Sequence, residues 1–236
     1  MNKSYKNKFI RKIYRERDIR LIEDKINMLG DRRTFSAVSF MNSRLVTSII
    51  VFLLVLYYSE LGYVLAPIIA VVYYYIYYYI FITRNIKLRT AKLDKEALYF
   101  FEILTLTLES GRNLENALEV TVKNVDSELS REFEKTLFEM KFGKSLVESL
   151  HDMKKRIPSE TINNIILSIT QTNVFGNSIV ATMYDQLDFL RDKQILEIKG
   201  QMAKLPNKIS MVSVIFIVPL ILMLILGPLL INFLGS

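Results

Sequence analysis

The sequence predicts an all-α membrane protein: an N-terminal transmembrane helical hairpin, a cytoplasmic antiparallel bundle of about six helices, and one C-terminal transmembrane helix. Of the 236 residues, 51% are apolar and 23% are charged, yet no Asp, Glu, Lys, Arg or His occurs in 45–59, in 61–83 or after Lys208. Elsewhere, apolar residues recur at the spacing of amphipathic helices, and no stretch alternates with the two-residue period of a strand. This segregation excludes intrinsic disorder and an ordinary soluble globule.

Two uncharged stretches near the N-terminus form the hairpin. About 20 apolar residues cross the hydrocarbon core of a bilayer as a helix, and the span 63–82 meets this length. The span 45–58 is shorter, so it crosses only if Phe40–Arg44 enters the interface and the Arg44 side chain snorkels toward water. Because only 59–62 separate the two spans, they lie antiparallel. A re-entrant first span would break this arrangement, and the basic N-terminal segment would then face outward.

The C-terminal span is the apolar stretch Met211–Leu234, which contains no ionisable side chain. Pro219, Gly227 and Pro228 interrupt it, and we expect kinks there that neighbouring helices make tolerable. The predicted divisions of the chain are a basic N-terminal segment, the hairpin, the cytoplasmic bundle and the last span, at residues 1–44, 45–82, 83–208 and 209–236.

The distribution of charge predicts the orientation of the spans. Residues 1–44 hold 12 Lys and Arg against 5 Asp and Glu, whereas the turn between the first two spans holds Glu60 and no cation. Under the positive-inside rule, the N-terminus and residues 83–208 are cytoplasmic, and the turn and the C-terminus lie outside. We interpret the basic segment as a membrane-surface anchor because it directly precedes a span; nucleic-acid binding is the competing interpretation.

Between residues 83 and 208 the sequence predicts helices joined by tight turns. A signature of Gly, a polar residue and then Leu or Ile occurs three times, and in each copy the glycine takes the left-handed position that ends one helix. Asn or Ser two residues later caps the next helix. Ser127 and Pro158 begin two further helices. The three glycines, each with its following apolar residue, are Gly111 and Leu114, Gly143 and Leu146, and Gly176 and Ile179.

Signatures of enzymatic chemistry are missing from the sequence. It contains no Gly-x-x-x-x-Gly-Lys-Ser/Thr phosphate-binding loop, so we expect no ATP hydrolysis by this chain and no bound cofactor. It also contains no cysteine, which excludes disulfides and thiolate metal sites. The single histidine, His151, is predicted to be a surface residue rather than a zinc ligand. We therefore expect a protein that is not an enzyme.

Two groups of polar side chains are candidates for contacts. Asp185, Asp188 and Asp192 share one helix face; they predict either a solvated or partner-binding face or, with Glu102 or Glu109, a calcium site. A tyrosine cluster occupies the cytoplasmic half of the second span. An aromatic belt explains part of it, and hydroxyls in hydrocarbon favour helix–helix contacts within an assembly. The intramembrane candidates are Tyr73, Tyr74, Tyr77 and Tyr78 in this span, and Pro219, Gly227 and Pro228 in the last.

Four segments occur in a recognisable order. They are LTLTLESGRNLENAL at 104–118, FGKSLVESL at 142–150, FGNSIVATMYDQL at 175–187, and AKLPNKISMVSVIFIVPLILMLILGPL at 203–229, where Pro206 marks the entry to the last span. The set resembles the type II secretion system F family, the inner-membrane platform proteins of type II secretion and type IV pili. The layout of a hairpin, one F domain and a final span is closest to the TadB/TadC branch of tight-adherence (Flp) pilus machinery.

The resemblance implies a multi-pass protein of a bacterial or archaeal cytoplasmic membrane. It implies coupling of a cytoplasmic secretion ATPase to extraction and polymerisation of pilin-like subunits, and an oligomer with itself or with a sister F-domain protein. The candidates for contact with the ATPase are Glu115, Glu119, Asp185, Asp188 and Asp192. The competing class is a membrane-anchored helical adaptor or signalling scaffold unrelated to secretion.

Overall fold

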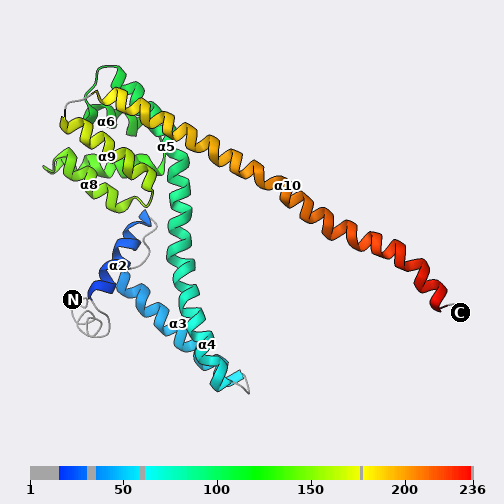
Figure 1. The fold of residues 1–236 in the computed structure, drawn as a ribbon. Coiled ribbons are helices and arrows are strands. Elements are labelled where there is room, and N and C mark those ends of the chain that lie inside the picture. Colours follow the sequence, from blue (N-terminus) through cyan, green and yellow to red (C-terminus); the bar gives the residue numbers. More distant parts are fainter. Residues whose placement is uncertain (1–15, 31–35, 59–61, 176–177, 235–236) are drawn as a thin grey trace. The chain divides into compact units, whose positions relative to one another are not determined.

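The computed structural model describes residues 16–30, 36–58, 62–175 and 178–234. Every regular element in these ranges is a helix (Figure 1), which confirms the all-α class. The chain divides into two compact units, residues 1–186 and 187–236, and the division falls within the last helix. The helices are α2 (Glu16–Asn27), α3 (Ala37–Tyr58), α4 (Gly62–Tyr78), the π-helix η2 (Tyr79–Arg84), α5 (Asn85–Glu109), α6 (Leu114–Asn124), α7 (Glu128–Lys141), α8 (Leu146–Arg156), α9 (Glu160–Phe175) and α10 (Ile179–Leu234).

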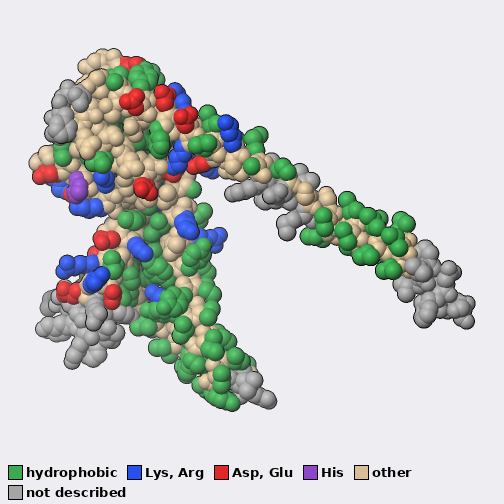
Figure 2. All heavy atoms as spheres, viewed as in Figure 1, with side chains coloured by type: hydrophobic (Ala, Val, Ile, Leu, Met, Phe, Trp, Pro, Cys, Tyr) green, Lys and Arg blue, Asp and Glu red, His purple; other side chains and the backbone are tan. Residues whose placement is uncertain are grey.

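The N-terminal apolar hairpin consists of α3 and α4, which lie side by side (Figure 1). α4, η2 and α5 form one uninterrupted helix, Gly62–Glu109. Both α3 and this long helix are long and apolar enough to cross a membrane. Their outward side chains are apolar and exposed, as the hydrophobic surface of the hairpin in Figure 2 shows. The structure thus provides two candidate spans at the N-terminal end.

The first of these helices differs from the prediction in its start and in its arginine. α3 begins at Ala37 rather than at residue 45, because the Ser36 Oγ caps it by accepting a hydrogen bond from the Ser39 backbone N–H at 3.2 Å. Its 22 residues include 40–44, the segment that the predicted span needs in order to reach full length. Arg44 does not snorkel toward water: it is 8% exposed, and its Nε donates to the Tyr74 carbonyl oxygen at 2.9 Å. The predicted snorkelling is wrong because α4 supplies an acceptor.

α2 is amphipathic, and its apolar face packs near the end of the hairpin that lies away from the turn. Ile26 and Leu29 are buried in one cluster with Phe40 of α3 and Ile82 of η2. Ile82 lies in a π-helix, whose wider turn leaves carbonyls without their usual partners. The Asn85 side-chain amide satisfies one of them by donating to the Phe81 oxygen at 2.8 Å. The apolar cluster thus joins the N-terminal helix to both helices of the hairpin.

The bundle has the predicted number of helices: α5 to α9 and the first turns of α10. Its centre is aromatic, with the rings of Phe100 and Phe133 stacked at a centroid distance of 4.7 Å and Phe101 edge-on to both. Apolar side chains from all six helices complete the core. Fully buried among them are Leu93, Ala97, Leu104, Leu118, Leu129, Ile162, Ile165, Ile166 and Met183.

The predicted glycine junctions hold where the structure describes them. Gly111 and Gly143 have φ values of 84° and 92°, the left-handed conformation that glycine adopts without strain. Asn113 then caps α6 by accepting from the Asn116 N–H at 2.9 Å, and Ser145 forms a capping box at the start of α8. Gly176 lies outside the described residues. The apolar residue that follows each glycine is buried at Leu114 and half-buried at Leu146 and Ile179.

Of the two other predicted helix starts, one is confirmed and one is wrong. Ser127 caps α7, with its Oγ accepting from the Ser130 N–H at 2.9 Å, as predicted. Pro158 does not begin α9. The Oγ of Ser159 accepts from the Ile162 N–H at 3.1 Å, so the helix starts at Glu160 and the proline precedes the cap. A serine side chain that satisfies an N–H of the first turn sets the helix start more strongly than the proline does.

The C-terminal helix α10 runs without a break from Ile179 to Leu234. Pro206 and Pro219 lie inside it, so the helix before the apolar stretch continues through Pro206 into that stretch. A proline removes only one hydrogen bond to the preceding turn, and the rest of a long helix continues past it. The apolar stretch of this helix whose side chains are described is Val212–Leu226, which is shorter than a full span. Gly227 and Pro228 lie outside the residues whose side chains are described.

Candidate functional site

A buried ionic network is centred on Arg89 of α5, which is 6% exposed. Its Nε donates to Glu128 Oε1 at 2.6 Å, and its Nη2 donates to Glu132 Oε1 at 2.7 Å, both carboxylates belonging to α7. Its Nη1 donates to the carbonyl oxygens of Met28 at 2.7 Å and Arg156 at 2.8 Å. One guanidinium therefore joins α5 to α7 and to the ends of α2 and α8.

The chemistry of these acceptors explains why an arginine lies here. Met28 directly follows α2 and Arg156 is the last residue of α8. The last carbonyls of a helix have no partner within the helix and carry the negative end of its dipole. Arginine offers five N–H donors in one plane, so it can bind two such carbonyls and two carboxylates at once. Lysine has neither the number of donors nor this geometry.

Gly30 allows the chain after α2 to approach the guanidinium. Its φ is 67°, and a Cβ placed on it would lie 2.7 Å from Arg89 Cζ. Any other residue would be strained in this conformation and would also displace the arginine. The turn after α2 is therefore shaped to bring the Met28 carbonyl onto Arg89.

A second arginine extends the network through α7. Glu132, whose side chain is 3% exposed, accepts at its second oxygen from Arg156 Nε at 3.2 Å. Arg156 also donates from Nη1 to Glu139 Oε1 at 2.7 Å and from Nη2 to Thr136 Oγ1 at 3.2 Å. The buried carboxylate of Glu132 is thus held between two arginines, which compensates the cost of removing its charge from water.

At the rim of the network, lysines replace arginines. Burial by itself raises the pKa of Glu128, but hydrogen bonds from Arg89 and Lys92 outweigh burial, so this pKa lies below its ordinary value. Lys144 bridges Glu139 and Asp152, with its Nζ 3.0 Å from a carboxylate oxygen of each. Hydrogen bonds from Lys155 and Lys144 lower the pKa of Asp152 from 3.8 to about 2. The start of α8 is therefore tied to the end of α7 by ion pairs.

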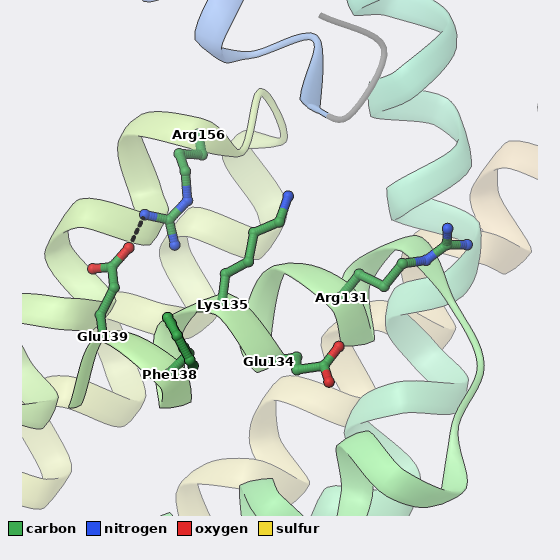
Figure 3. A pocket seen from close by; sticks show the side chains of 6 residues that line it. All are labelled: Arg131, Glu134, Lys135, Phe138, Glu139 and Arg156. Carbon is green, nitrogen blue, oxygen red and sulfur yellow. Dashed lines mark hydrogen bonds and ion pairs between the residues drawn. The ribbon is translucent and has the colours of Figure 1, made fainter. Parts of the chain in front are cut away.

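A surface cavity of about 480 Å³ lies beside the network, along α7. Its floor contains Arg156 and Glu139, the ion pair drawn as a dashed line in Figure 3. The Phe138 ring, which is 60% exposed, supplies its apolar part. Arg131, Glu134 and Lys135 complete the lining. The lining of the cavity thus combines one aromatic ring with charged side chains of both signs.

The acidic residues predicted to contact a partner lie outside this network. Glu115 is exposed in the first turn of α6, and Glu119 is half-buried one turn later. Asp185, Asp188 and Asp192 are exposed on α10, where Asp188 lies 3.5 Å from Arg191 Nη1. Within the described residues, no group of three or more such side chains is placed to hold a metal ion, so the calcium interpretation gains no support.

Three of the four candidate tyrosines, Tyr74, Tyr77 and Tyr78, contact α2 or α3, whereas Tyr73 contacts Tyr77 of its own helix. The Tyr77 hydroxyl lies 3.0 Å from Ser43 Oγ, and the Tyr78 hydroxyl accepts from Lys25 Nζ at 2.7 Å. The Tyr74 carbonyl and ring both contact Arg44, and the Tyr73 ring lies 6.1 Å from that of Tyr77. Their partners are helices of the same chain, so these contacts do not require an assembly.

Sequence reasoning missed the Arg89 network, although one signal was present. Arg89, Leu93 and Ala97 are spaced by four residues and all face the core of the bundle. An arginine that continues an apolar stripe predicts a buried cation, and a buried cation needs acceptors. Nothing in the sequence indicates that those acceptors come from α7 and from the ends of two other helices.

The fold and this network define a class: a helical protein in which an apolar hairpin continues into a helical bundle, and a buried arginine of the connecting helix binds both the bundle and the end of an amphipathic helix. A family model described as type II secretion system protein F matches residues 100–227, more than half of the chain. The chain therefore belongs to the type II secretion system protein F family. Neither the curated proteins nor the solved structures contain a match. Glu132 and Arg156 lie inside the matched region, whereas Arg89 precedes it, so the network fastens the family domain to the helices before it.

Proposed function

We propose that this chain is an inner-membrane platform protein of a type II secretion or Tad-like type IV pilus assembly machine. In this role it couples a cytoplasmic secretion ATPase to extraction and polymerisation of pilin-like subunits, and it carries no catalytic site of its own. Membership of the protein F family supports the general role. The hairpin followed by one family domain and a further apolar helix supports the TadB/TadC branch.

The observation that carries the mechanical part is the continuity of Gly62–Glu109, which leads from the apolar hairpin into the core of the bundle. A partner that pushes on the bundle can move a span only if the connection does not bend. Arg89 lies on this helix and fixes it to α7, to the end of α8 and to the end of α2 through four short hydrogen bonds. A displacement of the bundle is therefore passed to the helix rather than absorbed at the joint.

The proposed orientation follows the charge distribution, with the N-terminus and the bundle in the cytoplasm, and with α10 returning to the membrane so that the C-terminus lies outside. The lack of a phosphate-binding loop means that the energy comes from a partner. We assign the ATPase contact to the exposed carboxylates of Glu115, Asp185, Asp188 and Asp192, with Glu119 at its edge. Contacts with pilin helices and with a second F-domain subunit belong to the apolar spans.

The test is native purification of the tagged chain from its membrane, with identification of the proteins that accompany it. A secretion ATPase and small prepilin-like proteins are expected. Signalling proteins in their place would favour the adaptor class. The variant Asp185→Lys with Asp188→Lys is expected to lose the ATPase, whereas Glu197→Lys, an exposed carboxylate on the same helix, is expected to keep it. Equal recovery of ATPase by both variants would remove the assigned contact.

A further inference from the structure

A second cavity, of about 370 Å³, lies between α2 and the hairpin, apart from the Arg89 network. Three helices supply its polar lining: Asp18 and Lys25 from α2, Arg44 from α3, and the rings of Tyr74 and Tyr78 from α4. Its volume is in the lower part of the range of small-molecule sites. Neither the ionic network nor the proposed coupling role uses these side chains.

The two cations in this cavity are held in place by the tyrosines. The Arg44 Cζ lies 3.3 Å from the centroid of the Tyr74 ring and 5.2 Å from that of Tyr78. Its Nε is bound to the Tyr74 carbonyl, so the plane of the guanidinium is fixed. Lys25 donates to the Tyr78 hydroxyl at 2.7 Å, with its Nζ 5.3 Å from the same ring. Two cations that share an aromatic wall are already ordered before any ligand arrives, which lowers the entropic cost of binding.

The height of the cavity along the hairpin matches the inner leaflet. At 1.5 Å per residue, Tyr74 and Tyr78 lie about 18 and 24 Å along the helix from Gly62, in a bilayer whose hydrocarbon core is about 30 Å thick. Cations and tyrosines are favoured where the acyl chains meet the head groups, and lipid phosphates move inward toward such cations. The apolar part of the lining comes from Leu21 and Ile22 of α2 and Met41 of α3.

The signs of the charges specify the ligand further. Arg44 and Lys25 are suited to a phosphate diester, and Arg44 adds the planar donor geometry that phosphate favours. Asp18 lies in the same lining and is suited to an ammonium group. An anion and a cation within one small headgroup are the chemistry of phosphoethanolamine.

We propose that this cavity binds the headgroup of a phosphatidylethanolamine molecule of the inner leaflet. The phosphate is bound by Arg44 and Lys25, the ammonium group by Asp18, and the acyl chains lie along Leu21 and Met41. The inference rests on the hairpin lying in a membrane in the orientation proposed above. It does not rest on the secretion role, so loss of that role leaves it standing.

The experiment is native mass spectrometry of the full-length chain in detergent, titrated separately with phosphatidylethanolamine, phosphatidylglycerol, diacylglycerol and inorganic phosphate. Lys25→Gln and Arg44→Gln are each expected to weaken phosphatidylethanolamine binding about tenfold, the effect of one lost charge-assisted hydrogen bond. The matched control is Arg20→Gln, an α2 cation whose side chain is 78% exposed and pairs with Glu16; it is expected to bind like the unaltered chain. Asp18→Asn is expected to abolish the preference for phosphatidylethanolamine over phosphatidylglycerol.

Several outcomes would overturn the proposal. Equal binding by Lys25→Gln and Arg20→Gln would show that the cavity does not hold the phosphate. Displacement of the lipid by millimolar inorganic phosphate would show that the cavity binds a free anion. Tighter binding of phosphatidylglycerol than of phosphatidylethanolamine by the unaltered chain would show that Asp18 does not bind the ammonium group. The binding result for Arg44→Gln is interpreted only if this variant has the same helical circular dichroism as the unaltered chain. If Arg44→Gln is misfolded, the result for Lys25→Gln alone tests the proposal, because Lys25 is exposed and its replacement is expected to leave the fold intact.

Discussion

Replacing Arg89 by methionine tests whether the buried network fastens the helices together. Methionine keeps a similar length but removes every donor, so two carboxylates and two helix-end carbonyls each lose a hydrogen bond. Breaking a buried ion pair by removing one partner costs about 3–5 kcal/mol. Glu132 keeps Arg156 and Glu128 keeps Lys92, which places the expected loss of unfolding free energy near the lower end, about 3 kcal/mol.

Thermal unfolding of the full-length chain in detergent measures this loss. For a chain of this length, 1 kcal/mol corresponds to about 2–4 °C, so Arg89→Met is expected to lower Tm by about 6–12 °C. The matched control is Lys95→Met, which removes an exposed cation from the same helix. Surface changes of this kind alter stability by about 0.5 kcal/mol or less. Proteolysis in the segment between α2 and α3 is expected to accelerate in Arg89→Met alone, because the Met28 carbonyl loses its donor.

A double variant separates lost charge pairing from lost packing. Glu132→Met combined with Arg89→Met replaces the most deeply buried ion pair of Arg89 with two apolar side chains, a change that is often neutral in protein interiors. It is expected to recover part of the Tm lost in Arg89→Met. If Arg89→Met lowers Tm no more than Lys95→Met does, the network does not hold the helices together and the reasoning fails.

Three further predictions follow from local geometry. Gly30→Ala is expected to lower the free energy of unfolding more than Gly111→Ala does. Both glycines have positive φ, but only at Gly30 would the new Cβ meet another group, the Arg89 guanidinium. Chemical denaturation compares the two variants, and equal denaturation midpoints would contradict the expectation. Ser145→Ala removes the capping box of α8 and is expected to lower the free energy of unfolding by about 1 kcal/mol. A denaturation midpoint equal to that of the unaltered chain would refute this expectation. The pKa of Asp152 is lowered to about 2 in the folded state, so its ion pairs stabilise the fold above the ordinary pKa of 3.8 and this contribution is lost as the pH falls from about 4 to 2. The difference in Tm between the unaltered chain and Asp152→Asn is expected to shrink over that interval, and a constant difference would show that the pairing does not stabilise the fold.

The parts of the fold that the sequence predicts well are those decided within a few residues. The glycine turns at Gly111 and Gly143 and the caps at Asn113, Ser127 and Ser145 depend on φ preference and on a side chain that reaches its own backbone. Each is therefore visible in a window of four or five letters, and the number of bundle helices follows from such turns.

The errors occur where a distant partner changes the local preference. Arg44 was expected to reach water, but α4 places the carbonyl and ring of Tyr74 against it. The acceptors of Arg89 are separated from it by between 39 and 67 positions. Contacts at such separations depend on the fold as a whole, and a single sequence contains no pattern that predicts them.

Helix α2 contacts both the Arg89 network and the cavity beside the hairpin, and it packs against the π-helix η2 that lies between them. Lys25 binds Tyr78 immediately before η2, Ile26 packs in one cluster with Ile82 inside η2, and the carbonyl of Met28 binds Arg89 after it. A π-helix is wider and less regular than an α-helix, so it is the point at which a long helix under load bends most readily. α2 is fastened on both sides of this point and packs against it between them. The one irregular segment described between the hairpin and the bundle is therefore braced from outside, and an applied force is transmitted along Gly62–Glu109 only while that brace holds.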